Sequence, residues 1–159
     1  MILNKKILNK INNEIKKYPI NKKKSALISA LIILQENYGW LSKKLQKKIA
    51  KYINIPYISV LEIITFYKMY NLKPQGKYKI TICTSLSCVL SGANKIKSYL
   101  IKKLKINFNE TTLNKKITLI NGECIGTCGK GPVILVNNKY IYNNITKKKI
   151  NKLLKKEFK

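Results

Sequence analysis

The feature that most constrains this chain is its set of four cysteines, which fall into two close pairs. Cys83 and Cys88 are separated by four residues, Cys124 and Cys128 by three, and 35 residues lie between the pairs. The chain contains no histidine and only six acidic residues. Any transition-metal site must therefore be built from sulfur, alone or with a carboxylate. The fold has to bring two distant loops together if the four thiolates are to bind at one place.

The strongly basic composition does not by itself indicate a function. At 159 residues and 45% apolar content, the chain can form one medium domain or two small ones with a real core. A net charge of +27 usually suggests nucleic-acid or membrane binding. All 33 basic residues are lysine, however, and arginine, which is preferred for bidentate contacts with bases and phosphates, is absent. We interpret the charge as compositional drift and expect no specific nucleic-acid binding, with a selected polyanion-binding surface as the open alternative.

No segment suggests export or membrane insertion. The longest apolar stretch, residues 26–34, is much shorter than the roughly 20 residues that a membrane-spanning helix needs. The first residues lack the apolar segment of a signal peptide. Thiolates kept for a metal also fit a reducing compartment. We therefore expect a cytoplasmic protein with no direct membrane insertion.

The first 75 residues are predicted to form a bundle of four amphipathic helices, because apolar residues recur at intervals of three and four. Proline and glycine separate these helices. Two helix starts are expected at serines: Ser42 as an N-cap, and Ser59, with Glu62, as a capping box. The predicted helices occupy residues 2–18, 25–38, 42–53 and 59–67.

A break at residues 73–76 separates this bundle from a second predicted domain, residues 76–159. A strand over 78–82 leads directly into Cys83, and a strand over 117–120 ends shortly before Cys124. The remaining elements are a helix over 92–104, a hairpin turning at Asn137-Asn138, and a final helix capped by Thr146. A weak strand is expected at 106–108. The order of elements predicts an α+β or α/β fold, with helices flanking a thioredoxin-like sheet.

The loops that carry the cysteines suit an iron–sulfur cluster. Residues 84–87 are small and polar, and residues 122–132 are rich in glycine, which lets backbone N–H groups approach sulfur. A helix N-terminus expected just after Cys88 would offset the negative charge of the thiolates. The spacing favours a [2Fe–2S] cluster, with Cys83 and Cys88 on one iron and Cys124 and Cys128 on the other.

Other uses of four cysteines are less favoured, but one stays open. A four-cysteine zinc site accepts pairs with two to four intervening residues, so the spacing does not exclude it. Disulfides are disfavoured by the lack of an export signal, and dithiol catalysis uses C-x-x-C, which is absent. The chain also lacks a nucleotide-binding motif such as G-x-G-x-x-G.

Several short motifs together resemble a known family. In chain order they are QENYGWL at 35–41, IP at 55–56, TFY at 65–67, PQG at 74–76, the first cysteine pair with Gly92, ETT at 110–112, and ECIGTC at 123–128 followed by Gly131-Pro132. This set resembles the small thioredoxin-like [2Fe–2S] subunit, known as the E subunit, of NADH:quinone oxidoreductase, or respiratory complex I. The family usually has leucine where this chain has Ile125.

The resemblance implies a function as well as a fold. It implies that Cys83, Cys88, Cys124 and Cys128 bind one [2Fe–2S] cluster per chain, and that the chain carries electrons in an enzyme without being catalytic itself. It implies docking on the flavoprotein subunit that holds FMN and binds NADH, beside other peripheral-arm subunits on the cytoplasmic side of the inner membrane. The alternatives are the equivalent subunit of a soluble NAD-linked hydrogenase or formate dehydrogenase, a free-standing thioredoxin-like ferredoxin, and a four-cysteine zinc module.

Overall fold

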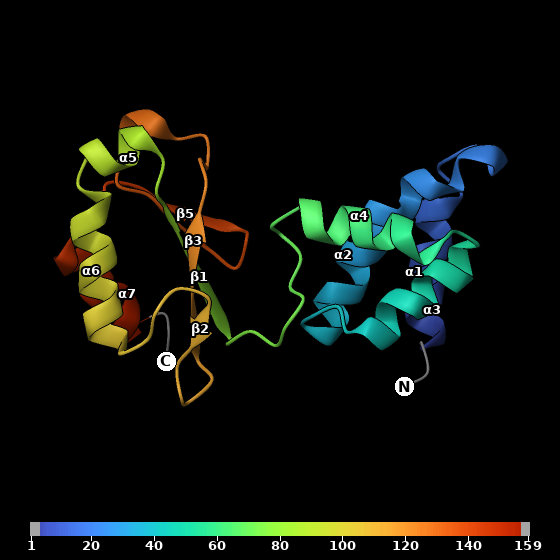
Figure 1. Ribbon diagram of the computed structural model, residues 1–159, viewed down its shortest axis with the longest axis horizontal. Helices are drawn as coiled ribbons and strands as arrows, with labels where there is room; N and C mark the ends of the chain where they lie inside the picture. The colour runs from blue at the N-terminus through green and yellow to red at the C-terminus, as the bar shows by residue number, and fades with distance from the viewer. Residues whose placement is uncertain (1–3, 157–159) are drawn as a thin grey trace. The chain divides into compact units, whose positions relative to one another are not determined.

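The computed structural model describes residues 4–156 and divides into two compact units, Met1–Pro74 and Gln75–Lys159 (Figure 1). The first unit is helical, and the second contains a sheet with flanking helices. Each unit buries a hydrophobic core of its own. Within residues 4–156, no helix combines the length and the apolar character needed to cross a membrane.

From residue 4 onward, where the structure is described, the helical unit consists of four α-helices and a 3-10 helix. The α-helices are α1 (Lys5–Ile15), α2 (Leu27–Tyr38), α3 (Lys43–Ile53) and α4 (Tyr57–Phe66), and the 3-10 helix η1 spans Ile20–Ala26. The four predicted helices are thus confirmed, although positions 2 and 3 of the first lie outside the described residues. Their apolar faces meet in a core that includes the fully buried Ile11, Leu31 and Leu34.

Of the two predicted serine starts, one is confirmed and one is wrong. The Leu45 N–H donates to Ser42 Oγ over 3.3 Å, which makes Ser42 the N-cap of α3. Ser59 lies inside α4 and is buried, because this helix already begins at Tyr57 after Pro56. Asn54 ends α3 in the left-handed conformation. Pro56 follows, and proline is tolerated at the start of a helix but not in its interior. Helix α4 therefore starts directly after this proline, ahead of the Ser59–Glu62 pattern.

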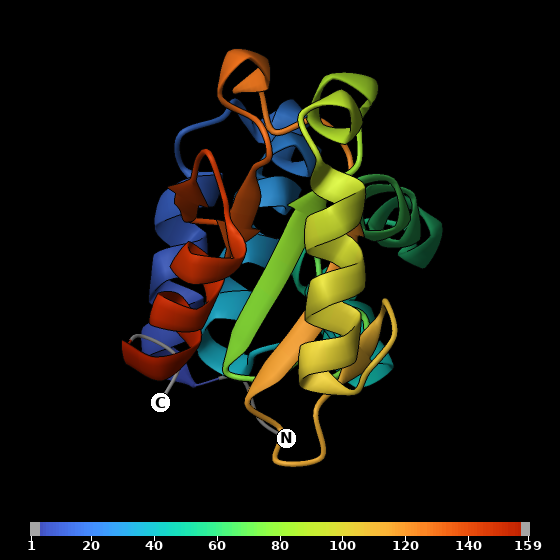
Figure 2. The same ribbon diagram turned by 90° about the vertical axis from the view of Figure 1, so that its left-hand side faces the viewer.

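The second unit is built on a mixed five-stranded sheet. Its strands are β1 (Tyr78–Cys83), β2 (Glu110–Thr111), β3 (Ile117–Gly122), β4 (Ile134–Val136) and β5 (Tyr140–Tyr142), in the order β2-β3-β1-β4-β5. Only the central pair, β1 and β3, is parallel. Helices α6 (Ala93–Leu104) and α7 (Lys147–Lys156) cover one face and bury Ile80 and Ile82 (Figure 2). The predicted order of a helical segment followed by a sheet with flanking helices is confirmed.

Local details of this unit test the remaining sequence predictions. Asn137 and Asn138 form the predicted hairpin turn with φ of 53° and 56°, and the Lys149 N–H donates to Thr146 Oγ1 over 3.2 Å at the start of α7. The strand expected at 106–108 is wrong, since pairing with β3 begins only at Glu110. Ile106 instead packs into the core of the sheet. A short helix, α5 (Leu86–Leu90), and a 3-10 turn, η2 (Cys128–Lys130), were not predicted.

Candidate metal centre

The two cysteine loops meet at one end of the sheet because β1 and β3 are parallel neighbours. Cys83, the last residue of β1, pairs in register with Gly122, the last residue of β3. Both strands therefore leave the sheet at the same edge, which is where parallel sheets commonly place their sites. Helix α5, which carries Cys88, contacts η2, which begins at Cys128 (Figures 1 and 2). The topology thus joins loops that are far apart in the sequence.

The four thiols form one buried pair and one exposed pair, and all of them are free. Cys83 and Cys88 are each 2% exposed and are hydrogen-bonded to each other. The Sγ atoms of Cys124 and Cys128 lie 3.2 Å apart on the exposed side. Among the described residues, no three His, Cys, Asp or Glu side chains are arranged to hold one metal ion. Two sulfur pairs are the donor set that a binuclear iron–sulfur cluster uses, so the residues present fit such a group.

Hydrogen bonds and burial give the two buried thiols different proton affinities. Burial acts to raise the pKa of Cys83, but hydrogen bonds from the Ser85 backbone, Cys88, the Ser85 side chain and the Ile125 backbone together hold the pKa below its usual value. Burial, followed by the hydrogen bond and charge of Cys83, raises the pKa of Cys88 to about 11, although the Val133 N–H acts in the opposite direction. Cys83 is thus the stronger acid of the buried pair.

The exposed pair is held by its own glycine-rich loop. The hydrogen bond with Cys124, followed by the charge of Cys124, raises the pKa of Cys128. The Gly126 N–H lies 3.4 Å from Cys124 Sγ, with Gly126 at a φ of 85°, a conformation that glycine adopts without strain. The expectation that this loop directs an N–H group toward sulfur is therefore confirmed at Gly126.

The helix predicted over 92–104, which begins shortly after Cys88, is confirmed as α6 with Gly92 as its N-cap. Cys88 itself lies inside α5, a short helix that was not predicted. Sequence reasoning also missed Ser85 and Val133 as hydrogen-bond partners of the thiols. Ser85 could have been suspected from its position two residues after Cys83, whereas Val133 reaches Cys88 only through the fold.

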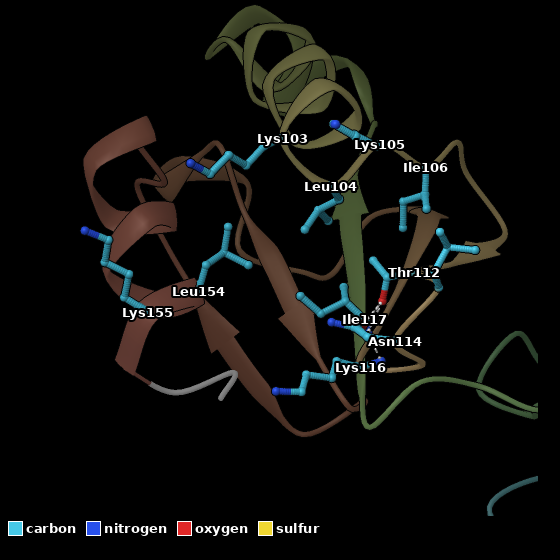
Figure 3. A pocket seen from close by; sticks show the side chains of 11 residues that line it. Lys103, Leu104, Lys105, Ile106, Thr112, Asn114, Lys116, Ile117, Leu154 and Lys155 are labelled. Atoms are coloured by element: carbon cyan, nitrogen blue, oxygen red, sulfur yellow. Dashed lines mark hydrogen bonds between the residues drawn. The ribbon is translucent and has the colours of Figure 1, made fainter.

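A groove at the opposite end of the sheet is separate from the thiols. Its walls include Lys103, Lys105, Lys116 and Lys155 around an apolar floor, and it adjoins Ile117, the first residue of β3 (Figure 3). Lysine is abundant throughout this chain, so four lysines at a groove do not by themselves identify a ligand. This groove takes no part in the candidate metal centre.

Comparison with known proteins identifies the family of this chain. A family model described as thioredoxin-like [2Fe-2S] ferredoxin matches residues 11–157. The chain is 41% identical to the E subunit of NADH-quinone oxidoreductase from Rickettsia typhi over 151 residues, covering 94% of this chain and 88% of the relative. It is 37% identical over 131 residues to the protein of the same name from Buchnera aphidicola, covering 82% of this chain and 76% of that protein.

Solved structures show the same fold in a larger protein. The structure of an air-oxidised NAD+-reducing [NiFe]-hydrogenase superposes with a TM-score of 0.68 at 17% identity, over 79% of this chain. The match spans only 22% of that hydrogenase chain. At this level of identity the likeness concerns the fold alone.

Proposed function

The chain belongs to the thioredoxin-like [2Fe-2S] ferredoxin family, and from this premise we propose that it is the electron carrier of NADH-quinone oxidoreductase that corresponds to the E subunit of its relatives. As a member of the family it carries one [2Fe–2S] cluster per chain. It is part of an enzyme complex and moves electrons without itself transforming a substrate. The observation that carries this proposal is that two pairs of free thiols lie on loops that meet at the carboxyl ends of β1 and β3.

We propose Cys83, Cys88, Cys124 and Cys128 as the cluster ligands, with the buried pair on one iron and the exposed pair on the other. When bound, the cluster supplies reversible one-electron transfer. Strand β1 and helix α5 hold the buried pair away from water. The Gly126 N–H donates to Cys124 Sγ, and such N–H groups tune the potential of a cluster bound by that sulfur. Cys124 and Cys128 lie on the exposed side, where an electron donor or acceptor can approach.

We further infer that the direct partner is the flavoprotein subunit that binds NADH and holds FMN, within the peripheral arm on the cytoplasmic side of the membrane. The chain's own sequence contains no G-x-G-x-x-G loop, so nucleotide binding is assigned to the partner. The soluble hydrogenase alternative has the weaker support. It rests on a fold likeness at 17% identity, while relatives at 37–41% identity are quinone-linked.

Anaerobic purification tests the cofactor directly. The protein is expected to be reddish, with about two irons and two labile sulfides per chain. Cys124→Ser is expected to lose or destabilise the cluster, while α1–α4 keep their helical circular dichroism because the helical unit has a separate core. A colourless protein with one zinc would contradict the assignment, and global unfolding of Cys124→Ser would contradict the independence of the helices.

The electron-transfer role has its own test. NADH is expected to reduce the cluster only when the flavoprotein subunit is added, as followed by bleaching of the visible spectrum. Reduction by NADH in the isolated chain would show that the nucleotide site had been assigned to the wrong subunit.

A further inference from the structure

The side chain of Ser85 reaches one of the buried thiols. Ser85 lies two residues after Cys83, where the chain leaves β1 and enters α5. Both its backbone N–H and its hydroxyl donate to the Cys83 sulfur. Serine at the N-cap of a helix ordinarily uses its hydroxyl to cap that helix, but Ser85, the N-cap residue of α5, makes no side-chain capping bond. Its hydroxyl is therefore directed to sulfur and not to the helix.

The sulfur that accepts this hydrogen bond is shielded from water. Cys83 is 2% exposed and belongs to a small buried cluster that includes Val133. Water has little access there to replace a lost donor, and a hydrogen bond to an ionised sulfur is stronger in such surroundings than in solvent. The exposed pair differs, because the donor at Cys124 is the backbone N–H of Gly126. At Cys83, in contrast, a side-chain substitution can remove a donor and leave the backbone donors in place.

We propose that Ser85 is a positioning residue for the cluster and that its hydroxyl, by donating to the Cys83 sulfur, raises the reduction potential. This inference rests on the proposed function, which assigns Cys83 as a ligand. Reduction adds negative charge that is shared with the ligand sulfurs, so a donor facing one of them stabilises the reduced form more than the oxidised form. Removal of the hydroxyl is therefore expected to lower the potential. A contact that only held the loop together would leave the potential unchanged.

Spectroelectrochemical titration of the full, cluster-containing chain tests the proposal with three variants. Ser85→Ala is expected to shift the equilibrium toward the oxidised form by about tenfold, which is about 59 mV for a one-electron couple. This change removes no helix cap. Ser85→Thr keeps a hydroxyl and is expected to keep the wild-type potential. Ser87→Ala is the matched control, because Ser87 is an exposed serine between the same two cysteines, and it is also expected to keep the wild-type potential.

The possible contrary results separate this inference from the proposed function. A Ser85→Ala protein that holds its cluster at the wild-type potential would overturn the role of Ser85 and leave the proposed function standing. A shift of the same size in Ser87→Ala would overturn that role too, because any loss of a hydroxyl near the thiols would then be the cause. If Ser85→Ala binds no iron, Ser85→Thr decides: the wild-type potential in that variant supports the hydroxyl, and a lowered potential overturns it. A wild-type protein without iron would overturn both proposals.

Discussion

At the scale of single residues, Tyr70 links the stability of the helical unit to pH. Its side chain is only 6% exposed, and its hydroxyl donates to the Ile28 carbonyl over 3.0 Å. Burial, followed by the neighbouring Tyr67, raises the pKa of Tyr70 to about 12. The unfolded chain therefore releases this proton at lower pH than the folded chain. The contribution of Tyr70 to stability is fully present below about pH 10 and is lost as pH rises toward 12.

Tyr70→Phe is expected to lower the free energy of unfolding by about 1 kcal/mol at neutral pH, the typical net value of one hydrogen bond. The difference from wild type should shrink as pH rises from about 10. Urea unfolding followed by circular dichroism at pH 7, 9 and 11 measures it, with Tyr140→Phe, at an exposed tyrosine, as the control. A difference that stays constant over this range would contradict the linkage.

The cysteines show how far residue-level prediction reaches. Spacing alone predicted two pairs, and the fold does bring the thiols together in those pairs. Spacing could not say which pair is buried, because Cys83 and Cys88 are buried by packing with Ala93 and Val133 while the second pair stays exposed. Spacing also could not identify Val133 as a hydrogen-bond partner of Cys88, because the pairing of β4 with β1 is what brings the Val133 N–H close to that thiol.

At the scale of elements, periodic segments were predictable and short ones were not. Long apolar faces specified α1–α4, α6 and α7, and the Asn137-Asn138 turn specified the hairpin. In contrast, α5 has five residues and β2 has two, too few for any period to be recognised. These elements form through contacts with η2 and β3 that lie outside their own sequences.

Packing between α5 and the second cysteine loop depends on Gly131. A Cβ added there would lie 2.9 Å from both Cβ and Oγ of Ser91 and 3.4 Å from the Cys88 Cα. Gly131→Ala is therefore expected to separate the two loops and destabilise the cluster-binding state by about 1–3 kcal/mol, as overpacking usually does. Gly129→Ala is the matched control, since nothing lies within 4 Å of its added Cβ. Iron release to a chelator measures the effect, and equal release rates in the two variants would show that this contact is not needed.

At the scale of the whole molecule, the two units differ in whether they carry the candidate metal centre. The core of the helical unit contains no cysteine, and all four thiols belong to the second unit. Positive charge follows no such division. Lysine triplets occur both at Lys22–Lys24, in η1, and at Lys147–Lys149, at the start of α7. A chain with a net charge of +27 spread in this way is expected to attract any polyanion, and we predict no specific site for one.

Nucleic-acid binding is accordingly expected to be weak, strongly reduced by salt and indifferent to sequence, because it depends on the release of counterions. A selected binding face would concentrate its charge and stack bases on aromatic side chains. Replacing Lys22–Lys24 with glutamine should therefore weaken binding to DNA and RNA by the same factor as replacing Lys147–Lys149, since each change removes three charges. Fluorescence anisotropy from 50 to 200 mM salt measures both variants against the wild type. Binding that survives physiological salt, prefers one nucleic acid and disappears with only one of the triplets would establish a true site and show that the charge has been selected.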